Sequence, residues 1–251
     1  PPLSKKLLLG EWEPDRIQLR QPDTFDELDV DWRLGVAAAR LDLDARVVHL
    51  ADGNALAFDG CIIATGASAR RHPEKDRYAH VHELRTVDDS LRLRAAIHAG
   101  DRHVVVIGAG FIGLEVAATA RQLGNEVTVL EGAPAPLMRG LGSEMGSAVG
   151  ALHEAEGVRL RCDVHVDRLH DDGVLLAGDE LIRSDVVVVG IGVAPSTDWL
   201  DGSGLKLRDG VVCDETLNAH DADGVAVDVE IETVGQPVAI QVKAEVARVS
   251  L

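Results

Sequence analysis

The sequence predicts an α/β protein built around a buried parallel sheet, and three observations indicate this class. An apolar strand (residues 103–107), an amphipathic helical pattern (111–124) and a second apolar strand (126–131) follow one another, which is the order of a βαβ unit. A further apolar run covers residues 186–193 and is broken by Gly190 and Gly192; its first four residues are all valine, as is typical of strands buried on both faces. The chain has 251 residues, of which 46% are hydrophobic, and this is enough to fill a sizeable core.

The first 68 residues are expected to form a helical turn, an irregular acidic stretch and then strands. Pro2 stands before a leucine-rich run, which suits a first helical turn because proline is tolerated there. Residues 39–60 alternate apolar and polar side chains around Asp52-Gly53, which predicts a β-hairpin. Residues 61–64 do not alternate, so we expect a strand buried on both faces.

The middle of the chain carries signals for helix ends and turns. Thr86 and Asp89 have the spacing of a capping box, and the helix that they begin is expected to stop at Gly100. A second helix is expected over residues 143–156. Strands near 158–162, 166–172 and 173–182 follow, with turns at 172–173 and 178–179, and we expect the fold to include a three-stranded β-meander.

Composition excludes several classes of function. A formal net charge of −17 argues against binding to nucleic acid or to anionic membranes, and no apolar run approaches the roughly 18 residues of a membrane span. Cys61, Cys162 and Cys213 form no CxxC pair, so we expect no redox disulfide and no metal site. We expect a cytoplasmic protein without a signal peptide. The chain begins at Pro1 without an initiator methionine, and we interpret it as a fragment or a processed product.

A glycine fingerprint of the Rossmann type lies between the first strand of the βαβ unit and its helix. Gly108 permits a tight turn, Gly110 lets the backbone approach a pyrophosphate, and Gly113 lets the helix pack closely on the strand. The pyrophosphate is expected to bind the free N–H groups at the start of the helix. The alternative is a tight strand-to-helix turn that binds nothing, and the fingerprint alone fits either NAD or FAD.

Glu131 ends the second strand, 18 residues beyond Gly113. An acid at this position is expected to accept hydrogen bonds from the ribose hydroxyls of the adenosine and to repel a 2′-phosphate. Residues 132–136 contain no arginine that could bind such a phosphate. The sequence therefore favours NADH over NADPH.

Four more segments surround this unit in a fixed order: PPLSKK from Pro1, CIIATGASAR from Cys61, VVVVGIGVAP from Val186 and DGVVCDETLNAHDADGV from Asp209. With the fingerprint, they make the chain resemble the FAD-dependent pyridine nucleotide-disulfide reductase superfamily, and most of all its ferredoxin and rubredoxin reductase branch, which includes putidaredoxin reductase. The resemblance extends to about Val225.

The resemblance implies a Rossmann-like NAD-binding domain inserted into an FAD-binding domain of the same kind. The implied ranges are 1–100 for a partial FAD domain, 101–200 for the NAD(H) domain, and 201–251 for the return to the FAD domain. The residues that the resemblance places at NADH are Gly108, Gly110, Phe111, Ile112, Gly113, Glu131, Gly190 and Gly192. Those that it places near FAD are Lys5, Ala38, Ala64, Thr65, Gly66, Arg70 and Asp228.

Lys5 and Glu115 match a lysine and a glutamate that flank the flavin ring in the family, and the resemblance makes them the candidate catalytic residues. A cation there would stabilise the negative charge that a flavin gains on reduction. The alternative for Lys5 is a solvated helix lysine, and for Glu115 an acid that complements the helix dipole.

The chain also departs from the family. Only one glycine fingerprint occurs, whereas family members carry another, for FAD, in a βαβ unit of roughly 30 residues ahead of the PPLSK-like segment. Val227 stands where the family has a glycine before the aspartate matched by Asp228. Without that unit a pyrophosphate loses its helix N-terminus and the sheet exposes an edge, so we expect this chain alone to bind FAD weakly.

The resemblance implies an NADH-dependent reductase that passes electrons through FAD to a small iron–sulfur or rubredoxin-type carrier, and the absence of CxxC fits this branch. A catalytically incompetent NAD-binding module without stable FAD is the alternative. A dehydrogenase acting directly on an organic substrate is less well supported, because no Ser-Tyr-Lys set for proton transfer is visible.

Overall fold

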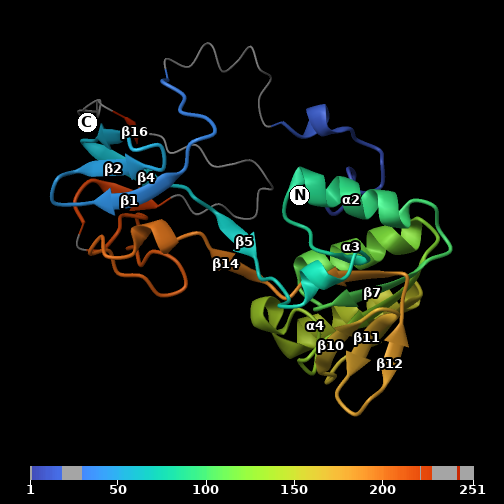
Figure 1. The fold of residues 1–251 in the computed structure, drawn as a ribbon. Helices are drawn as coiled ribbons and strands as arrows, with labels where there is room; N and C mark the ends of the chain where they lie inside the picture. Colours follow the sequence, from blue (N-terminus) through green and yellow to red (C-terminus); the bar gives the residue numbers. More distant parts are fainter. Residues whose placement is uncertain (1, 19–29, 221, 228–241, 244–251) are drawn as a thin grey trace, which may run out of the picture. The chain divides into compact units, whose positions relative to one another are not determined.

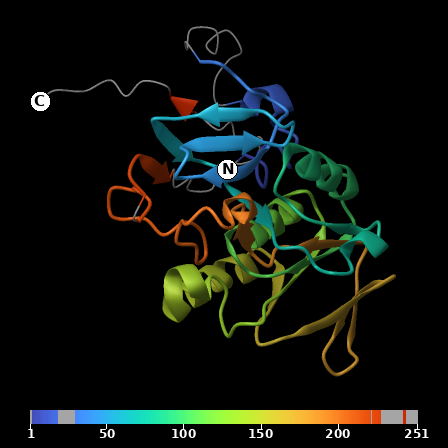
Figure 2. The ribbon, with the colours of Figure 1, turned by 60° about the vertical axis from the view of Figure 1, so that its left-hand side comes forward.

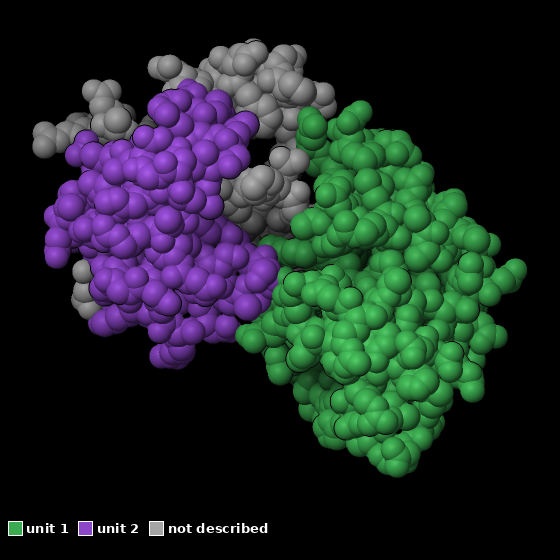
Figure 3. All heavy atoms as spheres, viewed as in Figure 1, with its two compact units in different colours: residues 1–19, 69–193 green, residues 20–68, 194–251 purple. Residues whose placement is uncertain are grey.

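The computed structural model describes residues 2–18, 30–220, 222–227 and 242–243. The chain divides into two compact units, coloured separately in Figure 3. Unit 1 comprises Pro1–Leu19 and Ala69–Val193, and unit 2 comprises Arg20–Ser68 and Ala194–Leu251. The larger segment of unit 1 is therefore inserted in the sequence between the two segments of unit 2. These boundaries differ from the breaks at 100 and 200 expected from the resemblance, and the assignment of a cofactor to each range stays a prediction.

Unit 1 is built on a five-stranded parallel sheet with the strand order β6-β13-β7-β8-β9. The apolar runs of the sequence form its central strands because both faces of these strands are covered: the four residues of β13 are all buried, as are the last four of β7. The strands are β6 (Val81–His82), β7 (His103–Ile107), β8 (Glu126–Leu130), β9 (Val158–Arg161) and β13 (Val186–Val189).

Helix α3 (Phe111–Gln122) covers one face of this sheet and an antiparallel meander covers the other; Figure 1 shows α3 above β7 and the meander below it. On the helix side, Val106 of β7 lies against Gly113 in α3. On the other side, Val105 and Ile107 share a core cluster with Leu169 and Val174 of the meander. The helices are α2 (Val87–Ile97), α3 (Phe111–Gln122) and α4 (Met138–Ala155), and the meander strands are β10 (Val166–His170), β11 (Gly173–Leu176) and β12 (Leu181–Arg183).

The structure confirms the Rossmann-like α/β class, with its βαβ unit β7-α3-β8 and its three-stranded meander. The capping box is present, since the Thr86 hydroxyl accepts a hydrogen bond from the Asp89 N–H and the Asp89 carboxylate accepts one from the Thr86 N–H. Helix α4 begins earlier than expected, at Met138, and is kinked at Gly142, whose φ is 76°. Among the described residues, no helix is both long and apolar enough to cross a membrane.

The N-terminal segment of unit 1 corrects one expectation. Residues 3–10 form consecutive hydrogen-bonded turns in place of a regular helix. The N–H of Leu7 bonds to the carbonyl of Pro2, five residues back, and Gly10 has a φ of +80°. A helix requires i to i−4 bonds and negative φ, so the chain turns away after this glycine. One further short element, η1 (Pro14–Ile17), follows.

Among the described residues of unit 2, the regular elements are mainly strands, and Figure 2 shows the antiparallel strands β1, β2 and β3 in blue and cyan. The Asp52-Gly53 hairpin is confirmed by the pairing of β2 with β3. Strand β4 pairs with β15 in parallel and with β16 in antiparallel orientation. The bounds in this part of the chain are β1 (Ala38–Asp42), β2 (Val47–Leu50), β3 (Ala55–Ala57), β4 (Gly60–Ile63), β5 (Ala67–Ala69), β14 (Val193–Pro195), η3 (Asp198–Leu200), β15 (Val225–Val227) and β16 (Val242–Lys243).

The expectation that β4 is buried on both faces is wrong. Cys61 and Ile63 point into the core of unit 2, whereas Ile62 between them exposes 44% of its surface. Successive side chains of a strand point to opposite faces, so only one face of β4 packs against this core. In the sequence, a short apolar run looks the same whether one or both faces of the strand are covered by other elements.

Candidate functional site

The glycine turn of unit 1 connects β7 to α3, and two of its glycines are required by close backbone packing. Gly108 has a φ of +99°, and a Cβ there would collide with the carbonyl oxygen of Gly190. A Cβ on Gly113 would collide with the carbonyl oxygen of Gly108. The turn, the start of α3 and the end of β13 therefore lie too close together for side chains at these positions.

Gly110 differs from the other two because the space beside it is open. It is the N-cap residue of α3, with φ −78° and ψ −179°, and a Cβ built on it would meet nothing within 4 Å. Phe111 and Ile112 are the first residues of the helix, and the first N–H groups of a helix have no partner within it. An open space at a helix N-terminus fits a pyrophosphate. The residues present thus fit a dinucleotide.

Glu131 follows directly on β8 and lies beside this turn. Its Oε2 accepts a hydrogen bond from the N–H of Ala109 at 2.6 Å, and its Oε1 accepts one from the N–H of Ala133 at 2.8 Å. The carboxylate thereby connects the glycine turn to the loop after β8. Ionised oxygens have further lone pairs, so the group can still accept a hydrogen bond from a hydroxyl.

Gly190 and Gly192 lie in the loop after β13. The N–H of Gly190 donates to the carbonyl of Ile107 at 2.7 Å, which brings this loop to the end of β7. The N–H of Arg70 donates to the carbonyl of Gly192 at 2.9 Å, and the Arg70 Nε donates to the carbonyl of Val193 at 2.9 Å. Arg70 therefore holds this loop, and its expected place near FAD stays a prediction.

Lys5 and Glu115, which are 110 positions apart in the sequence, meet in unit 1. The Lys5 Nζ lies 2.8 Å from Glu115 Oε1. The neighbouring Ser4 donates its hydroxyl to Glu115 Oε2 at 2.5 Å. Sequence reasoning missed Ser4 as a partner of this carboxylate, although Ser4 is part of the PPLSKK segment.

The residues expected near FAD in unit 2 lie on one strand and on the link between two others. Ala38 begins β1, and Ala64, Thr65 and Gly66 connect β4 to β5. The Thr65 hydroxyl donates to the carbonyl of Ser196 at 2.9 Å, so it joins the two chain segments of this unit. Asp228 lies outside the described residues. A role for these residues at FAD stays a prediction.

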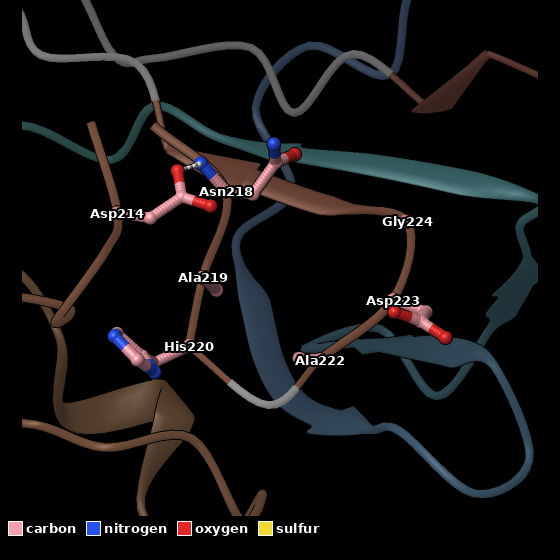
Figure 4. Close-up of a pocket in the computed structure, with 7 residues that line it drawn as sticks. All are labelled: Asp214, Asn218, Ala219, His220, Ala222, Asp223 and Gly224. Carbon is pink, nitrogen blue, oxygen red and sulfur yellow. Dashed lines mark hydrogen bonds between the residues drawn. The ribbon is translucent and has the colours of Figure 1, made fainter. Parts of the chain in front are cut away.

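A pocket of about 520 Å3 occurs elsewhere in unit 2 (Figure 4). Its lining is polar and includes none of the residues expected at either cofactor. The residues that line it are Asp214, Asn218, Ala219, His220, Ala222, Asp223 and Gly224. Hydrogen bonds from the Thr216 side chain and backbone, followed by one from the Asn218 N–H, lower the pKa of Asp214. These contacts account for Asp214 as a turn residue. In the described part of the chain, no group of three or more His, Cys, Asp or Glu side chains could hold a metal ion.

Comparison with known proteins matches residues 1–226 to the pyridine nucleotide-disulphide oxidoreductase family. The chain is 37% identical over 227 residues to rhodocoxin reductase of Rhodococcus erythropolis, covering 88% of this chain and 53% of the relative. It is 36% identical to the ferredoxin–NAD(+) reductase component of the p-cumate 2,3-dioxygenase system of Pseudomonas putida, covering 93% of this chain and 55% of the relative.

The fold is also similar to solved structures. The covalent putidaredoxin reductase–putidaredoxin complex matches with a TM-score of 0.82 and 30% identity, over 90% of this chain and 57% of the matched chain. The chain thus spans about half the length of the curated relatives that it matches. From the extent of the family match and the shared Rossmann-like core, the chain belongs to the pyridine nucleotide-disulphide oxidoreductase family.

Proposed function

We propose that the chain binds NADH through unit 1 and serves as the NADH-oxidising part of a flavin-dependent reductase. The observation that carries this proposal is the open glycine turn at the start of α3 with the Glu131 carboxylate hydrogen-bonded beside it. NADH bound there would supply a hydride, and FAD, when bound, would accept its two electrons with the proton and could pass the electrons on one at a time. Both features lie in unit 1, so we expect NADH binding to be a property of this unit.

The residues of the site have distinct proposed tasks. The first-turn N–H groups of α3 bind the pyrophosphate, and Glu131 accepts hydrogen bonds from the ribose hydroxyls and disfavours a 2′-phosphate. Gly190 and Gly192 leave room for the nicotinamide. Lys5, held by Glu115, supplies a positive charge that stabilises negative charge developing on a reduced flavin.

A small redox protein is the proposed acceptor of the electrons. The matched relatives are named as reductases of rhodocoxin, ferredoxin and rubredoxin, and this supports an iron–sulfur or rubredoxin-type carrier as partner. We also propose a cytoplasmic location, where the three free cysteines would remain reduced.

The test is anaerobic titration of the purified chain with NADH in the presence of added FAD. We expect bleaching of the flavin absorbance and NADH-dependent reduction of ferricyanide. Full flavin loading without either response would contradict the proposal. The flavin content before addition of FAD tests the separate expectation that this chain alone binds FAD weakly.

The alternative is an NAD-binding module without stable FAD. The observation that favours it is that both the glycine turn and Glu131 belong to unit 1, so NADH could bind without any residue of unit 2. Calorimetry separates the two. NADH binding without measurable FAD binding supports the module, whereas binding of both nucleotides supports the reductase.

A further inference from the structure

Ser4 is a buried polar residue that uses both its hydroxyl and its carbonyl in contacts with helix α3. Its surface is 2% exposed. The hydroxyl donates to Glu115 Oε2 at 2.5 Å, and the carbonyl accepts a hydrogen bond from the Thr119 hydroxyl at 2.6 Å. Glu115 and Thr119 are one helical turn apart and so lie on the same side of α3. Ser4 is therefore fixed to this side of the helix at two points.

The two oxygens of the Glu115 carboxylate have different partners. Oε1 faces the Lys5 ammonium at 2.8 Å, whereas Oε2 receives the Ser4 hydroxyl. The Lys5 side chain is 49% exposed, and exposed ion pairs constrain their partners weakly. The Ser4 hydroxyl is buried and its hydrogen bond to Glu115 is partly buried; a hydrogen bond to a charged group is stronger and shorter than a neutral one. The orientation of the carboxylate is thus determined by Ser4 more than by Lys5.

A third hydrogen bond anchors the same segment without touching Glu115. The hydroxyl of Ser90, in α2, donates to the carbonyl of Leu3 at 2.7 Å, and both residues are buried. Removing this hydroxyl would loosen the segment to a similar degree as removing the Ser4 hydroxyl. Ser90 therefore provides a matched control.

We propose that Ser4 is a positioning residue that sets the Lys5–Glu115 pair, with Thr119 holding Ser4 in place. Because Oε2 is already bonded to Ser4, the carboxylate presents only Oε1 to Lys5, and the ammonium is held at one place with donors left over for a second group. Without Ser4 the carboxylate can rotate and the ammonium loses this fixed place. The importance of this for electron transfer rests on the proposed function, whereas the positioning itself does not.

The positioning is tested by a double-mutant cycle of Lys5→Met and Glu115→Gln, measured by urea unfolding of the whole chain. In the unchanged background we expect the two substitutions to be coupled by about two- to fivefold in the unfolding equilibrium constant, the range of partly exposed pairs. In the Ser4→Ala background the coupling should fall to about one, and in the Ser90→Ala background it should persist. Equal coupling in both backgrounds would overturn the proposal, as would no coupling in the unchanged chain.

A kinetic measurement on the same variants separates this proposal from the proposed function. With FAD supplied, Ser4→Ala should lower kcat for NADH-driven ferricyanide reduction and leave the KM for NADH unchanged, since the glycine turn is untouched. Ser4→Ala should cause no further loss in a Glu115→Gln chain. If the unchanged chain, fully loaded with flavin, reduces no acceptor, the proposed function fails, and the unfolding cycle still decides whether Ser4 positions the pair.

Discussion

The carboxylate of Glu131 accepts the backbone N–H of Ala109 at 2.6 Å, so the acid proposed to select NADH also holds the glycine turn. Ala109, which stands between Gly108 and Gly110 in the sequence, is fully buried. A single side chain therefore links cofactor choice to the shape of the phosphate-binding loop. A substitution at Glu131 should therefore have two effects that can be measured separately, one on NADH affinity and one on the free energy of unfolding.

We expect Glu131→Ala to weaken NADH binding by about tenfold or more and to narrow the preference for NADH over NADPH. The loss of two hydrogen bonds from backbone N–H groups to a charged acceptor should also lower the free energy of unfolding by about 1–3 kcal/mol. Calorimetry and urea unfolding measure the two effects. Glu126→Gln is the control, since Glu126 begins the strand that precedes Glu131 and its side chain forms an exposed ion pair with Arg159; an equal loss of NADH affinity in this control would contradict the role of Glu131.

Alanine substitutions at two glycines of the turn should separate ligand binding from packing. Gly110→Ala meets open space, so its cost in stability should stay below about 1 kcal/mol while NADH affinity falls by about tenfold or more. Gly113→Ala forces a Cβ against the carbonyl of Gly108, and such overpacking typically costs about 1–3 kcal/mol. Thermal unfolding and NADH titration of both variants give the test. Unchanged NADH affinity in Gly110→Ala would remove the pyrophosphate from this turn.

Local signals made much of unit 1 predictable, because a buried strand, a glycine turn and a capped helix each depend on neighbouring residues. Contacts between distant segments could not be read in the same way. Ser4 and Glu115 are 111 positions apart, and no periodicity in the sequence connects them. Ile62 is a case in which a local signal was misleading. Its apolar run predicted burial, but burial of Ile62 would require another element on the second face of β4, and Ile62 is exposed. The Lys5–Glu115 pairing was expected only through family resemblance.

The capping box of α2 should make stability depend on acid pH. Burial alone raises the pKa of Asp89, but hydrogen bonds from the Thr86 backbone and hydroxyl, then from the Arg85 N–H and the Arg92 side chain, outweigh it and lower the pKa below 3.8. Because the folded pKa is depressed, this stabilisation is present above about pH 4 and is lost as the pH falls through the folded value.

Thr86→Ala should accordingly reduce the free energy of unfolding by about 1 kcal/mol at neutral pH. Thr86→Ser keeps the hydroxyl and should recover most of that loss. Urea unfolding measured between pH 7 and pH 3 provides the comparison. The difference between the Ala variant and the unchanged chain should shrink at the acid end; a constant difference over this range would contradict the proposed link to Asp89.

The thiol of Cys61 should be the least reactive of the three in the folded chain. Cys61 is 2% exposed on β4, and burial raises its pKa from 9.0 to about 11, whereas Cys162 and Cys213 are half-buried. Thiolates are the reactive form, so Ellman's reagent at pH 8 should label Cys61 only on unfolding. A raised folded pKa favours the protonated thiol, so its contribution to stability is present below pH 9 and is lost as the pH rises toward 11. Cys61→Ala should remove the slow labelling phase and leave the faster ones unchanged; three equal labelling rates in the folded chain would show that β4 opens readily to solvent.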